Sequence, residues 1–406
     1  MTSRLYVAIA FGMTIAQIVS VSFRFFTTMY TGIMPPPNSM VKEMTKVYNF
    51  SAGPAVLPKE VIKKAQDELT SFKGSQMSVM EISHRSSLYT EMFQKAEEDL
   101  RYLMEIPDDY DILFQQGGAT LQFTAVPLNL ANNYRRIGYI DTGHWSQRAY
   151  QEAELLHKFD VDVVASSKDS NYTELVHQVE LENKNYDYVH LTTNNTIEGT
   201  MYRKLPSGLA GQTVVADMSS NILGQKYNVD DFGLIYAGAQ KNIGIAGLTV
   251  VIVKRDLIGK VSNLPSMLDY KKQADKQSAL NTPPVFAIYM AGLVFEWLKE
   301  QGGVAAMQTL NEEKSQLLYE YLDNSTLFSS PVKREDRSLT NIPFVTGNKQ
   351  LDEKFIAEAT SAGLLNLKGH RLVGGMRASL YNAFELEGVK VLVDFMKEFE
   401  LKNKGE

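Results

Sequence analysis

Short apolar runs recur along the chain from residue 48 onward, and small or turn-forming residues bound each of them. Segments long enough to form helices, with mixed polar and apolar positions, separate the runs. The runs are Ile112–Phe114, Ile137–Ile140, Tyr188–Leu191, Val214–Ala216, Leu234–Ala237 and Leu248–Val253. Fully apolar strands that alternate with helices are typical of a parallel sheet covered on both faces. The pattern therefore predicts an α/β fold built on a mostly parallel sheet.

The sequence also divides into a large and a small part. A helix that begins near Pro284 is interrupted at Gly302-Gly303, and a second α/β pattern follows to the C-terminus. We expect a large α/β domain over residues 59–305. Residues 47–58 and 306–406 should form a smaller α/β domain. With 406 residues, the chain is long enough to bury two such cores.

The first 46 residues differ in character from the rest. Residues 5–23 carry no charged side chain, and as a helix they would span about 28 Å, close to the thickness of a bilayer core. One interpretation is a start site assigned too far upstream, since Met40 and Met44 lie just before the globular sequence. The less favoured alternative is an apolar anchor or targeting segment at residues 5–23. In both cases residues 1–46 form an extension outside the fold.

The composition excludes several functions. The sequence has no cysteine, which rules out disulfides, thiolate metal sites and cysteine nucleophiles. Its net charge is −6 without long runs of one sign, so it lacks the basic footprint of a nucleic-acid-binding protein. We therefore expect no metal site and no nucleic-acid partner. A cytoplasmic location fits a cysteine-free enzyme, and a membrane tether through residues 5–23 is the minority alternative.

Polar and small residues follow five of the predicted strands. In open α/β sheets, ligands bind at the carboxyl ends of the strands. The segments at these ends are Gly117–Thr120, Gly143–Trp145, Thr193–Thr196, Asp217–Ser220 and Gly238–Asn242. Five such ends predict one shared binding site.

Two of these strand ends indicate a particular cofactor. Lys241 follows a buried strand, where desolvation lowers the pKa of its amine and makes it a nucleophile. Asp217 directly follows Val214–Ala216. Taken alone, the lysine could simply reach solvent and the aspartate could be a helix N-cap. Together they suit pyridoxal 5′-phosphate, with Lys241 as the Schiff-base lysine and Asp217 paired with the pyridinium nitrogen.

Other strand ends offer what this cofactor needs. Gly117–Thr120 precedes a helix that starts near Leu121, and backbone N–H groups at such an N-terminus can bind phosphate. Neither a Walker loop nor a G-x-G-x-x-G motif after a strand occurs, which argues against a nucleotide site. Trp145 either stacks on the pyridine ring or belongs to the core.

Arginine and histidine residues in polar, non-periodic segments are candidates for substrate binding. His84-Arg85 and His370-Arg371 are two separate pairs, and Arg377 follows the second pair closely. Arginine forks bind carboxylates and phosphates in a bidentate manner. The residues therefore suit a ligand with a carboxylate and a second anion. Surface salt bridges are the alternative for each of them.

These segments resemble the phosphoserine aminotransferases, a family of fold-type-I enzymes that use pyridoxal phosphate. The resemblance covers about residues 47–402. The segments that carry it are Tyr-Asn-Phe-Ser-Ala-Gly-Pro-Ala (48–55), Ser-His-Arg (83–85), Tyr-Ala-Gly-Ala-Gln-Lys-Asn-Ile-Gly (236–244), Asn-Thr-Pro-Pro (281–284) and Lys-Gly-His-Arg-Leu-Val-Gly-Gly-Met-Arg-Ala-Ser (368–379).

The resemblance implies a role for each candidate residue. Lys241 and Asp217 are the catalytic pair, Trp145 stacks on the cofactor, and Thr196 binds near its phenolic oxygen. The positions around the cofactor phosphate are Ala119, Thr120 and Gln240, with Asn281 and Thr282 reaching the phosphate of the neighbouring subunit. The distal phosphate or carboxylate of the substrate would meet His84, Arg85, His370 and Arg371, and Arg377 would bind the α-carboxylate. Some members have arginine at the position of Thr120, so a side-chain charge is missing there.

The implied activity is reversible amino transfer from L-glutamate to 3-phosphohydroxypyruvate in serine biosynthesis, by a homodimer with shared active sites. A role in pyridoxine biosynthesis stays open. The alternatives are another fold-type-I aminotransferase, such as an alanine–glyoxylate type, or an inactive binding protein with the same fold.

Overall fold

The computed structural model describes residues 46–182 and 184–403. The predictions for the N-terminal extension and for its apolar segment at residues 5–23 lie outside these ranges. Within the described residues, no helix combines the length and the apolar character needed to cross a bilayer.

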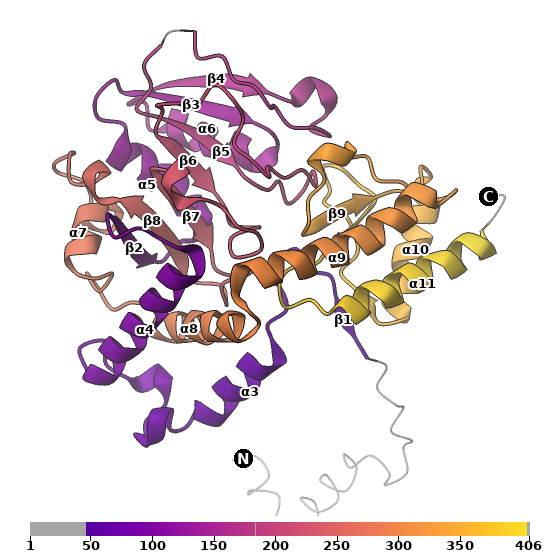
Figure 1. Cartoon of the computed structure of the whole chain (residues 1–406), viewed down its shortest axis with the longest axis horizontal. Coiled ribbons are helices and arrows are strands. Elements are labelled where there is room, and N and C mark those ends of the chain that lie inside the picture. The colour runs from indigo at the N-terminus through magenta and orange to yellow at the C-terminus, as the bar shows by residue number, and fades with distance from the viewer. Residues whose placement is uncertain (1–45, 183, 404–406) are drawn as a thin grey trace, which may run out of the picture. The chain divides into compact units, whose positions relative to one another are not determined.

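Within the described residues, seven strands form one sheet in the order β2-β8-β7-β6-β5-β3-β4 (Figure 1). The strands are β2 (Tyr110–Gln115), β3 (Arg136–Asp141), β4 (Asp160–Ser166), β5 (Tyr188–Thr192), β6 (Val214–Asp217), β7 (Leu234–Gly238) and β8 (Thr249–Lys254). Strand β8 pairs antiparallel with both β2 and β7, and the other pairs are parallel. The mostly parallel sheet is confirmed, and all six predicted runs form strands.

Strand β4 is the strand that the apolar pattern missed. It lies at the edge of the sheet beside β3, and its residues are partly exposed, with Val163 47% exposed. A strand at the edge of a sheet that helices do not fully cover is partly exposed to solvent. Such a strand does not need an apolar residue at every position. The alternating Asp-Val-Asp-Val sequence of β4 reflects that position.

Helices cover both faces of the sheet. They are α3 (Lys59–Glu68), α4 (Ser87–Met104), α5 (Gly118–Leu130), α6 (His144–Leu155), α7 (Tyr270–Asp275) and α8 (Val285–Glu300). Successive strand residues point to opposite faces. Ile235 and Ala237 therefore pack in a core with α4 and α8, whereas Leu234 and Tyr236 pack in a core with α5 and α6. This double cover explains why the central strands are apolar throughout.

The C-terminal part builds a core of its own. Its elements are β1 (Tyr48–Asn49), α9 (Gly303–Asn324), β9 (Asn341–Phe344), α10 (Lys349–Ser361), β10 (Leu364–Leu365), β11 (Met376–Ser379) and α11 (Leu386–Lys402). Phe50 joins this core, because β1 pairs in parallel with β10. The separate cores support the division into residues 59–305 and residues 47–58 plus 306–406, which stays a prediction.

A buried lysine stabilises one loop of this C-terminal part. Lys314 lies in α9 and is 0% exposed. Its ammonium group donates hydrogen bonds to the carbonyl oxygens of Leu380, Tyr381 and Phe384, at 3.2, 2.9 and 3.2 Å. The three N–H donors of the lysine thus meet three acceptors. The lysine fixes the path of the chain after β11.

We expect Lys314→Met to lower the free energy of unfolding by about 3 kcal/mol, because it leaves buried carbonyl oxygens without a donor. Chemical denaturation of the two proteins measures the difference. The control is Lys390→Met, which changes an exposed lysine of α11 in the same way. Equal stability of both variants would contradict the structural role of Lys314.

Candidate functional site

Three of the predicted residues meet at the carboxyl ends of adjacent strands. Asp217 is the last residue of β6, Lys241 follows β7, and Thr196 follows β5. The amine of Lys241 donates a hydrogen bond to the hydroxyl oxygen of Thr196 at 3.2 Å. The charge of Asp217 acts on Lys241 and raises the pKa of its amine. The structure therefore brings Lys241, Asp217 and Thr196 together.

Opposing effects set the protonation of this pair. Burial lowers the pKa of Lys241 to about 8, Asp217 counteracts this shift, and the charge of Arg377 adds to it. Burial also raises the pKa of the Asp217 carboxyl, against the hydrogen bonds from Ser219 and the charge of Lys241. The backbone N–H of Ser219 donates to Asp217 at 2.9 Å. An amine with a pKa near neutrality can act both as a nucleophile and as a base.

The segment at residues 50–55 passes close to Lys241. A Cβ atom on Gly53 would lie 3.6 Å from Cγ and 3.7 Å from Cε of Lys241, and Gly53 has a φ of +138°. The backbone N–H of Ala55 donates to the carbonyl oxygen of Gln240 at 2.8 Å. A glycine here permits the close approach of two chain segments. The side-chain amide of Gln240 lies against Gly238, so its contact with a cofactor phosphate stays a prediction.

Positively charged and imidazole side chains gather around Arg377, whose charge acts on Lys241. Arg377 donates from Nη1 to the carbonyl oxygen of Thr196 at 3.1 Å. Burial lowers the pKa of His370, and the charges of Arg377 and Arg371 lower it further. The rings of His370 and His144 have centroids 6.0 Å apart. We use the name anion pocket for the four neighbouring side chains of His144, His370, Arg371 and Arg377, because together they suit a ligand with negative charge.

His144 of the anion pocket and its neighbour Glu198 were not assigned from the sequence. Burial lowers the pKa of His144, as do the charges of His370, Arg148 and Arg371. Glu198 is 8% exposed and accepts a hydrogen bond from the backbone N–H of His144 at 2.8 Å. Burial raises the pKa of Glu198. Both residues lie in polar segments that follow strands. This position is the sequence feature that could have identified them as site residues.

Trp145 lies in the first turn of α6, next to the anion pocket. The centroids of its ring and that of His144 are 5.1 Å apart. Its indole Nε1 is buried and has no hydrogen-bond partner among the described residues. The ring is partly buried and packs against the core on this face of the sheet, as the alternative interpretation expects, and stacking on a cofactor stays a prediction.

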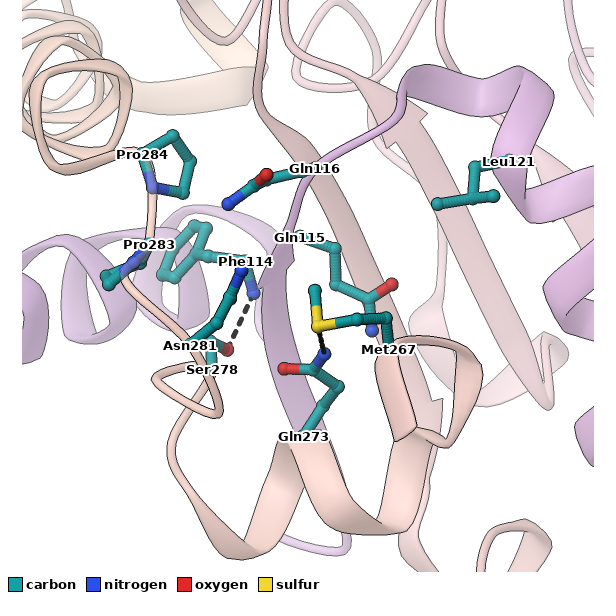
Figure 2. Close-up of a pocket in the computed structure, with 10 residues that line it drawn as sticks. All are labelled: Phe114, Gln115, Gln116, Leu121, Met267, Gln273, Ser278, Asn281, Pro283 and Pro284. Atoms are coloured by element: carbon teal, nitrogen blue, oxygen red, sulfur yellow. Dashed lines mark hydrogen bonds between the residues drawn. The ribbon is translucent and has the colours of Figure 1, made fainter. Parts of the chain in front are cut away.

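The start of α5 borders a pocket of its own, shown in Figure 2. Gly117 and Gly118 have φ values of +96° and +67°, and Ala119 and Thr120 follow in the first turn of α5. Asn281 lines the pocket together with Gln116 and Leu121 (Figure 2). The side-chain amide of Gln116 donates to the carbonyl oxygen of Thr282 at 3.3 Å. The structure therefore places Asn281 and Thr282 beside the predicted phosphate loop of their own chain.

His84 and Arg85 lie just before α4. The rings of His84 and Tyr89 have centroids 6.5 Å apart, and the Arg85 side chain is exposed. Within the part of the chain that the structure describes, neither side chain forms a hydrogen bond, ion pair or ring contact with Lys241, Asp217 or Thr196. Neither contacts the anion pocket in these ways. Their predicted contact with substrate stays a prediction.

Several buried polar atoms at this edge of the sheet have no partner among the described residues. They are Nε2 of Gln115, Nε1 of Trp145, Oγ1 of Thr192, Oε2 of Glu198, Oγ1 of Thr249 and Nε of Arg377. Gln115 ends β2, Thr192 ends β5, and Thr249 begins the reversed β8, so all three lie at the same edge. Unpaired buried polar groups are rare in native proteins and are common where a ligand completes them. The residues therefore fit a polar, anionic cofactor such as pyridoxal phosphate.

Comparison with known proteins agrees with this geometry. The profile of the Aminotransferase class-V family matches residues 47–392. The phosphoserine aminotransferase of Lactiplantibacillus plantarum is 59% identical over 359 residues, which cover 88% of this chain and 99% of that protein.

Solved structures give the same answer. A phosphoserine aminotransferase studied for radiation damage of its Schiff base has a TM-score of 0.86 and 44% identity, covering 88% of this chain and 99% of that one. The pyridoxal-phosphate-bound phosphoserine aminotransferase from Trichomonas vaginalis has a TM-score of 0.81 and 38% identity, covering 87% of this chain and 100% of that one. The fold-type-I architecture and the resemblance seen in the sequence are both confirmed. The chain belongs to the class-V aminotransferase family.

Proposed function

We propose that the enzyme transfers the amino group of L-glutamate to 3-phosphohydroxypyruvate and so produces O-phospho-L-serine and 2-oxoglutarate for serine biosynthesis. Its cofactor is pyridoxal 5′-phosphate, in agreement with its family and with a relative that binds it. The observation that carries the proposal is the environment of Lys241, whose amine has a pKa of about 8. That amine interacts with the carboxylate of Asp217 and lies beside an anion pocket.

Each residue of the proposed site would bind a different part of the cofactor. We assign Lys241 to its aldehyde carbon, Asp217 to its ring nitrogen, Thr196 to its phenolic oxygen, Trp145 to its ring face, and Ala119, Thr120 and Gln240 to its phosphate. When bound, the cofactor supplies an electron-accepting ring that makes loss of the substrate Cα proton feasible. Asp217 would keep a proton on the ring nitrogen. The amine of Lys241 would take the substrate Cα proton and return it as a general acid and base.

The anion pocket explains how one site accepts two substrates. Both substrates have an α-carboxylate, which we assign to Arg377. The distal group is a carboxylate in glutamate and a phosphate in the keto acid, and we assign it to His370 and Arg371. Burial lowers the pKa of His370, and the positive charges of Arg377 and Arg371 lower it further. An imidazole in this state is neutral and can gain a proton when a dianion binds, so the charge of the pocket adapts to its ligand.

We also propose that the enzyme is a cytoplasmic homodimer whose active sites are shared. His84, Arg85, Asn281 and Thr282 would then act in the site of the second subunit. Arg85, Asn281 and Thr282 are exposed in the single chain, as residues that await a partner should be. The separation of His84 and Arg85 from the anion pocket supports the same arrangement.

Two observations argue against the alternatives. An alanine–glyoxylate type of aminotransferase does not need a distal site for a dianion, whereas this chain gathers two arginines and two histidines near Lys241. An inactive binding protein has no need of a desolvated amine coupled to a buried carboxylate.

The cofactor and the donor half-reaction can be tested by absorption spectroscopy of the full chain with added pyridoxal phosphate. We expect a visible band that decreases when glutamate is added and returns with 3-phosphohydroxypyruvate. Lys241→Ala should lack the band, and Lys260→Ala, a change at an exposed lysine, should keep it. A folded chain without a visible band would refute the proposed function.

The reactivity of Lys241 should depend on pH in a defined way. Acetylation of the cofactor-free chain by acetic anhydride, followed by peptide mass spectrometry, reads the fraction of neutral amine. Labelling should rise with pH around a midpoint of about 8, whereas a lysine in a short model peptide, with a pKa of about 10.4, gains reactivity only at higher pH. Asp217 raises this pKa and Arg377 lowers it, so Asp217→Asn should move the midpoint down and Arg377→Ala should move it up. Unchanged midpoints would show that the charges are not coupled.

Substitutions in the anion pocket should separate the two ends of the substrate. Arg377→Ala should lower kcat/KM about 100-fold for glutamate and for the keto acid alike, because both lose a bidentate carboxylate contact. Arg371→Ala should affect 3-phosphohydroxypyruvate more than glutamate, since phosphate has the larger charge. Single-turnover measurements of each half-reaction give both ratios. Loss of only one half-reaction in Arg377→Ala would reassign that residue.

A further inference from the structure

Behind Asp217, two buried aromatic side chains form a chain of polar contacts on the same face of the sheet. Tyr236 of β7 lies directly opposite Asp217 of β6 in the strand pairing. The Tyr236 hydroxyl and the Asp217 carboxyl therefore lie on the same face of the sheet and interact electrostatically. The same hydroxyl lies 2.8 Å from Nε2 of His190 in β5. All three residues are at least 95% buried.

The chemistry of the three groups fixes the direction of these bonds. Burial lowers the pKa of His190 to about 3 and raises that of Tyr236 well above its usual value, so both are neutral. An ionised carboxylate only accepts hydrogen bonds. We therefore assign the Tyr236 proton to Asp217 and the Nε2–H of His190 to the Tyr236 oxygen. This leaves Nδ1 of His190 as an acceptor, and Nδ1 is the ring nitrogen without a partner among the described residues.

The neighbours of His190 hold its ring in place without competing for these bonds. The rings of His190 and Tyr139 have centroids 5.1 Å apart, and those of His190 and Tyr236 are 5.9 Å apart and stacked. The hydroxyl of Tyr139 lies 3.4 Å from that of Tyr188. Tyr139 therefore packs on the imidazole but takes no part in the chain of hydrogen bonds.

We propose that Tyr236 and His190 are positioning residues for Asp217, which act through the bond sequence His190 to Tyr236 to Asp217. The two donors in series stabilise the ionised carboxylate and fix its orientation towards the site. This inference rests on the proposed function, because it gives the carboxylate its partner, the protonated ring nitrogen of the cofactor. Coupled hydrogen bonds in a buried environment polarise one another, so the outer residue can act on the carboxylate through the inner one.

The test compares two ligands that differ in one atom. One is pyridoxal phosphate, and the other is its 1-deaza analogue, in which a CH group replaces the ring nitrogen. Tyr236→Phe should weaken binding of pyridoxal phosphate to the cofactor-free full chain about tenfold, the size of one charge-assisted hydrogen bond. Binding of the analogue should not change, because it offers Asp217 no ring proton. Quenching of tryptophan fluorescence measures both dissociation constants.

Matched variants separate positioning from loss of structure. Tyr139→Phe removes a buried hydroxyl that lies outside the chain of bonds, and it should change neither dissociation constant. His190→Leu should reproduce the effect of Tyr236→Phe, and His190→Gln, which keeps an N–H donor, should restore tight binding. If Tyr236→Phe does not fold, as judged by thermal unfolding, the two His190 variants decide the question.

The outcomes are distinct. Equal weakening of both ligands, or a His190→Gln variant as weak as His190→Leu, would overturn the positioning role. A wild-type chain that binds neither ligand would instead refute the proposed function. In steady-state assays we expect Tyr236→Phe to lower kcat about tenfold, with the KM values of both substrates nearly unchanged.

Discussion

The site depends on burying an amine and a carboxylate at one edge of a sheet. Burial favours the neutral form of each group, so alone it would lower the pKa of Lys241 and raise that of Asp217. Each charge opposes the shift of the other, and Arg377 moves the balance towards a neutral amine. Neither partner can be removed without changing the chemistry of the other. The three-layer fold supplies the dry environment that makes this coupling strong.

Much of the fold could be predicted because its central strands are covered on both faces. Such strands must be apolar at every position, and the runs at residues 234–237 and 248–253 became β7 and β8. The antiparallel direction of β8 could not be predicted from the sequence. A buried strand is an apolar run whether it pairs in a parallel or in an antiparallel ladder. Strand β4 was missed because an edge position relaxes the demand for apolar residues.

Candidate site residues could be named from the sequence where they lie at strand ends. Asp217 is the last residue of β6 and Lys241 follows β7, and their separation fits two neighbouring strand ends. Tyr236 and His190 were hidden, since both lie inside apolar runs and read as core residues. Glu198 is positioned by a hydrogen bond from the backbone N–H of His144, which lies 54 residues earlier in the chain. A pattern in a single sequence cannot predict a contact between residues so far apart.

The reversal of β8 has a consequence for the segment that carries Lys241. Because β7 and β8 are antiparallel neighbours, this segment returns to the sheet at both ends. Gly238 pairs with Thr249, and the N–H of Ala239 donates to the carbonyl oxygen of Leu248 at 3.0 Å. The backbone on either side of Lys241 is thus held by the sheet, so the position of the amine is set by the torsion angles of its own side chain.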